Sequence, residues 1–153
     1  MKIAIGCDNA AVDLKNALKE FMLQQKNVEL IDMGVDSDTN PEFYPDIAER
    51  VALAVARGEF ERGVLICGTG LGMAITANKI PGVRAATCHD VYSAERARKS
   101  NNAQIITMGA RVIGVESAKT VLKAWLESEF AGGSSTPKVQ RIIDIEKKYL
   151  TGS

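Results

Sequence analysis

The chain has 153 residues, and its 19 Lys and Arg residues balance 19 Asp and Glu residues, so the formal net charge is zero. Nothing in this balance suggests a nucleic-acid-binding surface or an acidic partner, because both call for an excess of basic residues. A small anionic substrate remains compatible with it, since such a ligand needs only a few local cations. The length suits one domain with a sizeable core, and we expect a single domain over residues 1–153.

Strand-like and helix-like segments alternate along the chain. Apolar runs bounded by turn residues predict five strands, at Lys2–Cys7, Val28–Met33, Gly63–Cys67, Val83–Cys88 and Gln104–Met108. Helical spacing and helix-opening prolines predict helices at Ala10–Gln25, Tyr44–Ala56, Gly70–Lys79, Val91–Lys99, Glu116–Phe130 and Thr136–Tyr149. The alternation predicts an α/β fold, a three-layer α/β/α sandwich on a five-stranded parallel sheet.

Two segments stand outside this alternation. The polar loop Gly34–Phe43 is either a plain connection or a loop that covers a substrate. After residues 1–131, which form the α/β core, the glycine-rich break Gly132–Ser135 leads into an extra C-terminal helix over residues 136–149. That helix either packs on a partner subunit or lies solvated beside its own chain.

The sequence also bears on the cellular compartment. Met1-Lys2 leads directly into a strand-like run, and no apolar stretch approaches the length of a membrane span. The three cysteines are an odd number, which does not suit a disulfide framework. We therefore expect a cytoplasmic protein with reduced thiols and no membrane association.

The most informative stretch is Val64–Met73, a buried strand that ends at Cys67 and continues into Gly68-Thr69-Gly70-Leu71-Gly72. In open parallel sheets, ligands bind at the carboxyl ends of the strands. Unhindered backbone N–H groups in such a loop hold negative charge, and a helix start favours a thiolate. The residues alone leave a catalytic Cys67 and a merely packed Cys67 equally open. Because a dinucleotide fingerprint would need glycine at Met73, we expect no such cofactor.

Other chemically capable side chains fall near the same strand ends. Cys7, Asp8 and Cys88 join Cys67 there, but the cysteines form no Cys-x-x-Cys pair, so we expect no metal site. His89 is the one histidine of the chain, and we expect it to be structural. Two arginines, Arg84 and Arg111, flank strands near what we expect to be one edge of the sheet. Each either binds phosphate or pairs with a surface carboxylate.

Eight motifs occur in one order that is typical of a known family: Lys2–Asp8, Tyr44–Asp46, Ile66–Met73, Ala77–Arg84, Cys88–Ser93, Asn101–Asn102, Gly109–Gly114 and Phe130–Gly133. Over nearly the whole chain they resemble ribose-5-phosphate isomerase B and its relatives, the galactose-6-phosphate isomerase subunits. The resemblance implies a Rossmann-like fold and a homodimer or tetramer with active sites shared across the interface. It also implies cofactor-free isomerisation of an aldose phosphate to a ketose phosphate through a cis-enediolate, by default of ribose 5-phosphate to ribulose 5-phosphate in the pentose phosphate pathway.

The resemblance assigns roles residue by residue. Cys67 matches the base, and the Thr69 hydroxyl with the backbone of Gly68, Gly70, Leu71 and Gly72 matches the anion hole for the enediolate. Asp8 would bind sugar hydroxyls with Asn9 beside it, Tyr44 would line the pocket, Asn101 would contact substrate and Arg111 would hold phosphate. No metal is needed for this proton transfer.

Departures from the family pattern gather at substrate-handling positions. Asn9 stands where the family has histidine, Ser100 where it has its ring-opening histidine, and Phe43 where it has aspartate before Tyr-Pro. Ser134 and Lys138 replace two phosphate-binding arginines. Three interpretations follow: an isomerase of another sugar phosphate, of the four-carbon or galactose 6-phosphate type; a ribose-5-phosphate isomerase with a reorganised ring-opening step; or a non-catalytic sugar-phosphate-binding or partner subunit.

Overall fold

A computed structural model describes residues 1–150 of the chain, and residues 151–153, which the predicted domain 1–153 includes, lie outside the described residues. The strands and helices alternate as expected. The strands are β1 Lys2–Cys7, β2 Glu29–Asp32, β3 Arg62–Cys67, β4 Ala85–Thr87 and β5 Ile105–Gly109. The helices are α1 Val12–Leu23, α2 Tyr44–Ala56, α3 Leu71–Ala77, α4 Val91–Lys99, α5 Val115–Leu126 and α6 Thr136–Tyr149, with a short 3₁₀ turn at Gly133–Ser135.

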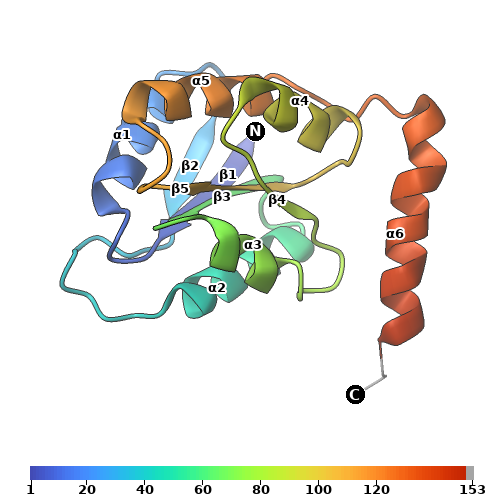
Figure 1. The fold of residues 1–153 in the computed structure, drawn as a ribbon, viewed down its shortest axis with the longest axis horizontal. Coiled ribbons are helices and arrows are strands. Elements are labelled where there is room, and N and C mark those ends of the chain that lie inside the picture. Colours follow the sequence, from blue (N-terminus) through green and yellow to red (C-terminus); the bar gives the residue numbers. More distant parts are fainter. Residues whose placement is uncertain (151–153) are drawn as a thin grey trace.

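The five strands form one parallel sheet in the order β2-β1-β3-β5-β4. Helices α1, α4 and α5 cover one face of the sheet, and α2 and α3 cover the other (Figure 1). The central strand β3 is buried along its whole length, which matches the apolar run Gly63–Cys67 that follows the buried Arg62. The predicted three-layer α/β/α sandwich is therefore confirmed.

Because the strands are parallel, all of their carboxyl ends lie along one side of the sheet, here called the carboxyl edge, and all of their amino ends lie along the opposite side, the amino edge. Cys7, Cys67 and Gly109 end their strands at the carboxyl edge, where Cys67 pairs with Gly109. Arg62 and Ile105 begin their strands at the amino edge. The six residues of β3 separate the two edges by about 16 Å, at about 3.3 Å per residue. Residues at opposite edges of one chain therefore cannot touch the same small ligand.

The helix predicted at Glu116–Phe130 is wrong at its C-terminal end, because α5 stops at Leu126. Arg62 is buried beneath this end, donating to the Trp125 carbonyl oxygen at 2.7 Å and to the Ser128 carbonyl oxygen at 2.8 Å. The guanidinium therefore takes carbonyl groups that a continuing helix would use itself. The other predicted elements match the structure with ends that differ by up to two residues.

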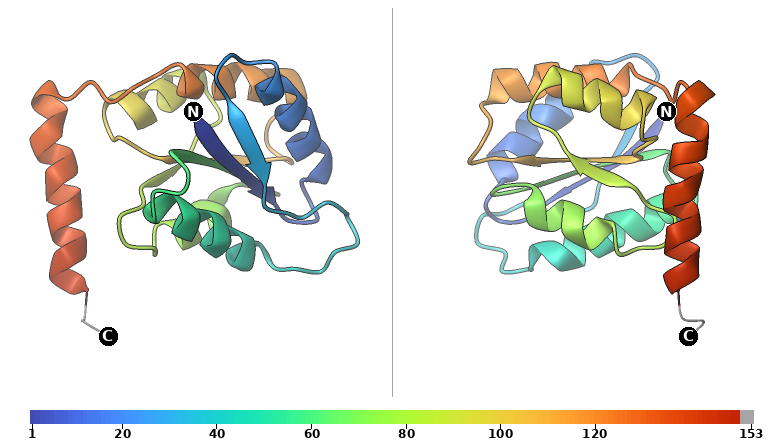
Figure 2. Two further views of the ribbon diagram at one scale, coloured as in Figure 1. Left: turned by 180° about the vertical axis from the view of Figure 1, so that it is seen from behind. Right: turned by 45° about the vertical axis from the view of Figure 1, so that its right-hand side comes forward.

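Helix α6 has the predicted bounds but lies outside the three layers, joined to them by the segment that follows α5 (Figure 2). Val139 is the buried residue of this helix, whereas Ile142, Ile145 and Tyr149 are 45%, 51% and 73% exposed. The helix thus turns much of its apolar surface to solvent in the single chain. Across the described residues 1–150, no helix combines the length and the apolar character needed to span a bilayer.

Candidate active site

A cavity of about 310 Å³ opens at the carboxyl edge of the sheet, at the small end of the size range of ligand pockets. Its walls come from the loop after β1, the start of α2, the loop after β3 and the turn after β5. The lining residues are Asp8, Asn9, Ala10, Tyr44, Cys67, Gly68, Thr69, Gly72 and Arg111. The structure therefore brings together most of the residues that the sequence motifs assigned to the site.

Cys67 differs from the other two cysteines in its surroundings. Its sulfur lies at the cavity wall and accepts a hydrogen bond from the Gly70 backbone N–H at 3.1 Å, a contact that stabilises negative charge on sulfur. Burial raises the pKa of Cys7 to about 11 and that of Cys88 to about 11, so these thiols stay protonated at neutral pH. Of the three cysteines, Cys67 is the one placed to act as a base.

The loop after Cys67 is held against β5. Gly70 has a φ of +79°, and a methyl group on it would lie 2.8 Å from the Met108 carbonyl carbon. The Thr107 hydroxyl donates to the Gly70 carbonyl oxygen at 2.8 Å. Thr69 fits closely against Gly109, where a methyl group would lie 2.6 Å from the Thr69 Cα. The loop is thus fixed on the side that faces β5.

Tyr44 lies across the start of α3. A methyl group on Gly72 would lie 2.2 Å from Tyr44 Cε1 and 2.4 Å from Cζ, so the phenol ring rests directly on the glycine backbone. Tyr44 begins α2 with Pro45 behind it, a residue suited to a helix start. The ring is 39% exposed, and its inner side closes the cavity.

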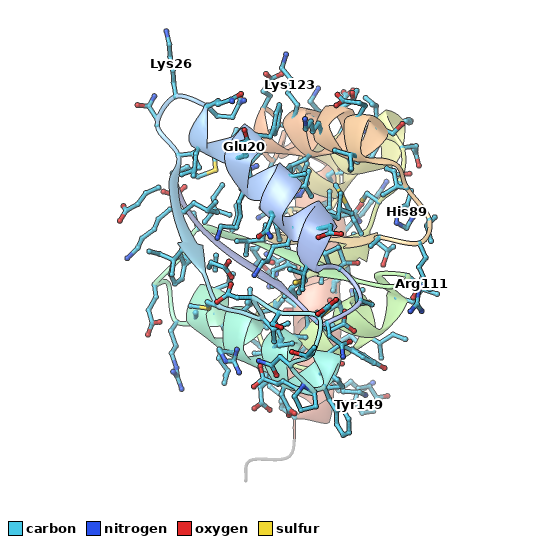
Figure 3. The ribbon with its side chains drawn as sticks, turned by 90° about the vertical axis from the view of Figure 1, so that its left-hand side faces the viewer. Glu20, Lys26, His89, Arg111, Lys123 and Tyr149 are labelled. Atoms are coloured by element: carbon cyan, nitrogen blue, oxygen red, sulfur yellow. The ribbon has the colours of Figure 1, made fainter. Side chains whose placement is uncertain are left out.

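Arg111 supplies the cation of the cavity. The turn that carries it is fixed to the backbone at Cys67 and Gly68, since Ala110 N–H donates to the Cys67 carbonyl at 2.9 Å and Arg111 N–H to the Gly68 carbonyl at 3.0 Å. Its guanidinium lies against Gly68, with Nη1 3.1 Å from the position of a built methyl group. The side chain is exposed at the surface (Figure 3). It is therefore available to an anionic substrate.

The expectation that Arg84 shares an edge with Arg111 is wrong. Arg84 precedes β4, and its carbonyl accepts from Ile105 N–H at 3.3 Å at the start of β5. Its Nε donates to the Asn102 carbonyl at 3.0 Å. Arg84 thus lies at the amino edge because it comes before its strand, whereas Arg111 comes after β5.

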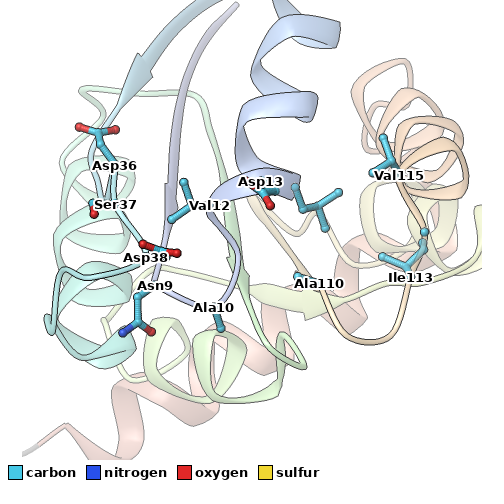
Figure 4. Close-up of a pocket in the computed structure, with 12 residues that line it drawn as sticks. Asn9, Ala10, Val12, Asp13, Asp36, Ser37, Asp38, Ala110, Ile113 and Val115 are labelled. Atoms are coloured by element: carbon cyan, nitrogen blue, oxygen red, sulfur yellow. The ribbon is translucent and has the colours of Figure 1, made fainter.

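Asp8 and Asn9 line the part of this cavity next to a second, larger one. Asp8 Oδ1 accepts from the Ala10 N–H at 3.1 Å, which leaves its other oxygen for a ligand. Asn9 and Ala10 also line a neighbouring cavity of about 780 Å³, whose other walls include Asp13 and Asp38 (Figure 4). Asn9 therefore lies at the boundary of the two cavities, beside the place where a sugar would bind in the smaller one.

Six assigned residues do not line this cavity: Gly70 and Leu71, which lie in the loop behind it, and Ser100, Asn101, Ser134 and Lys138. Ser100 and Asn101 follow α4 and precede β5, at the amino edge. Ala131 N–H donates to the Lys99 carbonyl at 3.1 Å, which brings the segment leading to Ser134 and Lys138 beside them. Within one chain, the assigned residues form two groups at opposite edges of the sheet.

Two further residues support the site without having been assigned to it. The Thr107 hydroxyl donates to the Gly70 carbonyl oxygen. The sequence held a signal for this contact: Thr107 is the one polar residue in the apolar run Ile105–Met108, and a buried hydroxyl needs a hydrogen-bond partner. His89 Nε2 accepts the Gly109 N–H at 2.8 Å. That contact depends on the alignment of two strands, which no local pattern indicates.

Comparison with known proteins identifies the family of the chain. A family model described as ribose/galactose isomerase matches residues 3–142. The chain is 55% identical over 142 residues to a D-erythrulose-4-phosphate isomerase of Pectobacterium atrosepticum, covering 93% of each chain. It is also 55% identical over 148 residues to a ribose-5-P isomerase B of Listeria innocua, covering 97% of this chain and 99% of the relative.

Among solved structures, ribose-5-phosphate isomerase B of Clostridium thermocellum superposes with a TM-score of 0.93 at 44% identity, over 98% of this chain and 100% of that one. The chain therefore belongs to the ribose/galactose isomerase family. The resemblance read from the motifs and the enzyme class, an isomerase, are confirmed.

Proposed function

We propose that this member of the ribose/galactose isomerase family interconverts an aldose phosphate and a ketose phosphate without a cofactor, and that its preferred substrate is an open-chain four-carbon sugar phosphate. The observation that carries the reaction class is the Cys67 sulfur at the cavity wall with the Gly70 N–H pointed at it. The observation that carries the substrate is Ser100, in place of a residue able to open a sugar ring.

The proton transfer follows from the cavity. The Cys67 thiolate removes the proton on the carbon next to the carbonyl, and the C–H electron pair forms the double bond of a cis-enediolate. The negative charge then rests on the former carbonyl oxygen. The Gly70 N–H is taken by the Cys67 sulfur and the Leu71 N–H by the Thr69 hydroxyl, so the remaining backbone N–H groups of the loop Gly68–Gly72 stabilise such a charge in advance of the reaction. The hydroxyl proton of the enediolate passes to the former carbonyl oxygen, and Cys67 returns the abstracted proton to the former carbonyl carbon while the other oxygen becomes the new carbonyl oxygen. This completes the exchange of aldose and ketose.

The remaining lining residues suit a sugar phosphate. The Arg111 guanidinium offers a planar donor set for phosphate oxygens. Asp8 presents a carboxylate oxygen to sugar hydroxyls, and Tyr44 closes the cavity with an aromatic face and a hydroxyl. Arg111, after β5, thus offers a cation to the phosphate end of a short polyol phosphate, and Asp8, after β1, offers a hydrogen-bond acceptor to its hydroxyl groups.

Ring opening separates the candidate substrates. In ribose 5-phosphate the C4 hydroxyl closes a furanose ring, which must open before the α proton becomes acidic. A general acid or base at that step contributes about 10²- to 10⁴-fold. In a four-carbon aldose phosphorylated on O4, no hydroxyl remains to close a five-membered ring, so this help is not needed.

The chain has one histidine, so every copy in a homo-oligomer brings the same one. His89 Nε2 is engaged with Gly109, and its ring borders a different cavity from that of Cys67. Ser100 does not titrate near neutral pH. The absence of a ring-opening histidine therefore favours the four-carbon substrate, in line with the name of the Pectobacterium relative. Ribose 5-phosphate is the second candidate, supported by the name of the Listeria relative.

The two groups of assigned residues support a shared site. We infer that the amino-edge group of one copy, Ser100, Asn101, Ser134 and Lys138, completes the Cys67 cavity of a second copy. The exposed apolar residues of α6, which directly follow Ser134 and Lys138, provide a surface for that association. Lys138 then meets the phosphate as a second cation. With its thiols free, such an assembly suits a reducing cytoplasm.

Steady-state rates test the proposal. We expect kcat/KM for D-erythrose 4-phosphate to exceed that for D-ribose 5-phosphate by about 100-fold, the contribution of a ring-opening catalyst. A preference for ribose 5-phosphate would contradict the four-carbon assignment and would favour the second candidate. The absence of turnover with any four- to six-carbon sugar phosphate would contradict the isomerase assignment itself.

A further inference from the structure

His89 lies next to the candidate active site without lining it. It follows β4 at the carboxyl edge of the sheet, and its ring borders a separate cavity of about 370 Å³ with Asp90, Glu116 and Thr120. Figure 3 shows His89 and Arg111 on the same side of the molecule. The Nε2 atom of the ring accepts the Gly109 backbone N–H at 2.8 Å. An imidazole nitrogen that accepts a hydrogen bond carries no proton, so the proton of the neutral ring is on Nδ1.

Gly109 connects this histidine to two parts of the site. It ends β5 opposite Cys67, and a methyl group on it would lie 2.6 Å from the Thr69 Cα. Its carbonyl oxygen accepts the N–H groups of Val112 and Ile113 at 3.0 and 3.1 Å, which closes the turn that carries Arg111. A shift of Gly109 would therefore displace both Thr69 and the Arg111 turn.

We propose that His89 is a positioning residue for the isomerase reaction: the neutral imidazole fixes Gly109, and through Gly109 it holds Thr69 and Arg111 in place. Protonation converts both ring nitrogens into donors, so the Gly109 N–H then faces another N–H and the contact is lost. The role in turnover rests on the proposed isomerase function. The hydrogen bond and its loss on protonation do not.

The surroundings of His89 keep it neutral at neutral pH. Burial lowers the pKa of His89 below its usual 6.5, while the Asp90 carboxylate acts in the opposite direction. Two charged groups line its cavity, Asp90 from its own loop and Glu116 from α5. Glu116 is paired with Lys119 at 3.3 Å, and Arg111 lies against Gly68. The positioning contact is therefore intact at neutral pH and is lost only in acid.

Rates measured between about pH 8 and about pH 5 test the role in turnover. His89→Gln keeps an acceptor oxygen that does not titrate, whereas His89→Ala removes the acceptor. At about pH 8 we expect kcat/KM to fall about tenfold in the alanine variant and to recover at least partly in the glutamine variant. As the pH falls, wild-type activity should decline relative to the glutamine variant. The substrate phosphate titrates equally for both proteins, so its effect cancels in the ratio.

Two kinetic results would overturn the role: an alanine variant as active as the wild type, or a wild-type to glutamine ratio that is constant with pH. Asp90→Asn provides a directional check, because it removes the charge that raises the pKa of His89. In Asp90→Asn, the decline of activity relative to His89→Gln should occur at lower pH than in the wild type. A shift in the other direction would also contradict the proposal.

NMR tests the contact independently of any substrate, because the single histidine gives one imidazole titration. We expect the Gly109 and Arg111 amide signals to move with the same midpoint as the His89 ring, below pH 6.5. Gly109 and Arg111 amide signals that do not shift as the His89 ring titrates would overturn the inference, whatever the substrate is. If no sugar phosphate is turned over, the proposed function fails, while the titration still decides whether His89 holds Gly109.

Discussion

A single methyl group at Gly72 should remove most of the activity without unfolding the protein. In Gly72→Ala, the new carbon would lie 2.2 Å from Tyr44 Cε1, 2.4 Å from Cζ and 2.7 Å from Oη. Carbon atoms in ordinary contact are about 3.5–4.0 Å apart, so the ring must move by more than about 1 Å. Misplacement of site groups by about 1 Å costs about 100-fold in rate, which is the loss of kcat/KM that we expect.

Stability should respond differently. Gly72 lies in α3, where alanine is favoured over glycine by about 0.5–1 kcal/mol. Tyr44 is 39% exposed, so its ring has a route into solvent and gives up only part of its packing. The two effects oppose each other, and we expect the free energy of unfolding to change by less than about 1 kcal/mol.

Urea unfolding and initial rates on the same preparations separate the two effects. Gly114→Ala is the matched control, because nothing lies within 4 Å of its built methyl group, and it should retain wild-type rates. Adding Gly72→Ala to Tyr44→Ala should cost no further activity, since the ring that the methyl group displaces is gone. Wild-type kcat/KM in Gly72→Ala, or additive losses in the double variant, would refute the reasoning.

Three further predictions concern separate parts of the molecule. Cys67→Ala should lower kcat at least about 10³-fold. Cys88→Ala is the control, because burial raises the pKa of the Cys88 thiol to about 11, and its kcat should stay within about twofold of the wild type. Comparable losses in both variants would contradict the base role of Cys67. Asp32→Asn removes the carboxylate charge that the fully buried Lys15 ammonium meets at 2.8 Å. Because Lys15 keeps Asp36 at 3.1 Å, the change should cost about 2 kcal/mol in urea unfolding at neutral pH. Burial raises the pKa of Asp32, but the hydrogen bonds from Lys15, Lys19 and the Gly34 backbone N–H lower it by more, so the pKa lies below 3.8. The stabilisation is therefore present above pH 3.8 and is lost as the pH falls below it. The difference in free energy of unfolding between variant and wild type should narrow in acid. Ser100→His should raise kcat/KM for ribose 5-phosphate about tenfold relative to erythrose 4-phosphate, and an unchanged ratio would show that ring opening is not what distinguishes the substrates.

The sequence predicted the elements well where local patterns determine them. Helix α6 begins and ends where expected, because a glycine break and Pro137 mark its start. The Cys67 loop was located from its glycines and its place after a buried strand. The end of α5 was not predicted, since it depends on Arg62, a residue more than sixty positions earlier in the chain.

The arrangement of the site depended on contacts that sequence patterns do not contain. The fit of Tyr44 on Gly72 joins two helices, and the His89–Gly109 hydrogen bond joins two strand ends. Arg84 was assigned to the wrong edge because flanking a strand does not say which end is flanked. Contacts between distant segments decide the first two cases, whereas the position of Arg84 before its strand decides the third.

Proton exchange with solvent tests the central claim most directly, because it reports the enediolate step whatever the equilibrium between aldose and ketose. In D₂O, the wild-type enzyme should incorporate deuterium at the carbon next to the carbonyl of D-erythrose 4-phosphate and D-erythrulose 4-phosphate, and Cys67→Ala should incorporate none above the uncatalysed rate. Exchange that persists in Cys67→Ala, or its absence in the wild type across four- to six-carbon sugar phosphates, would contradict the account.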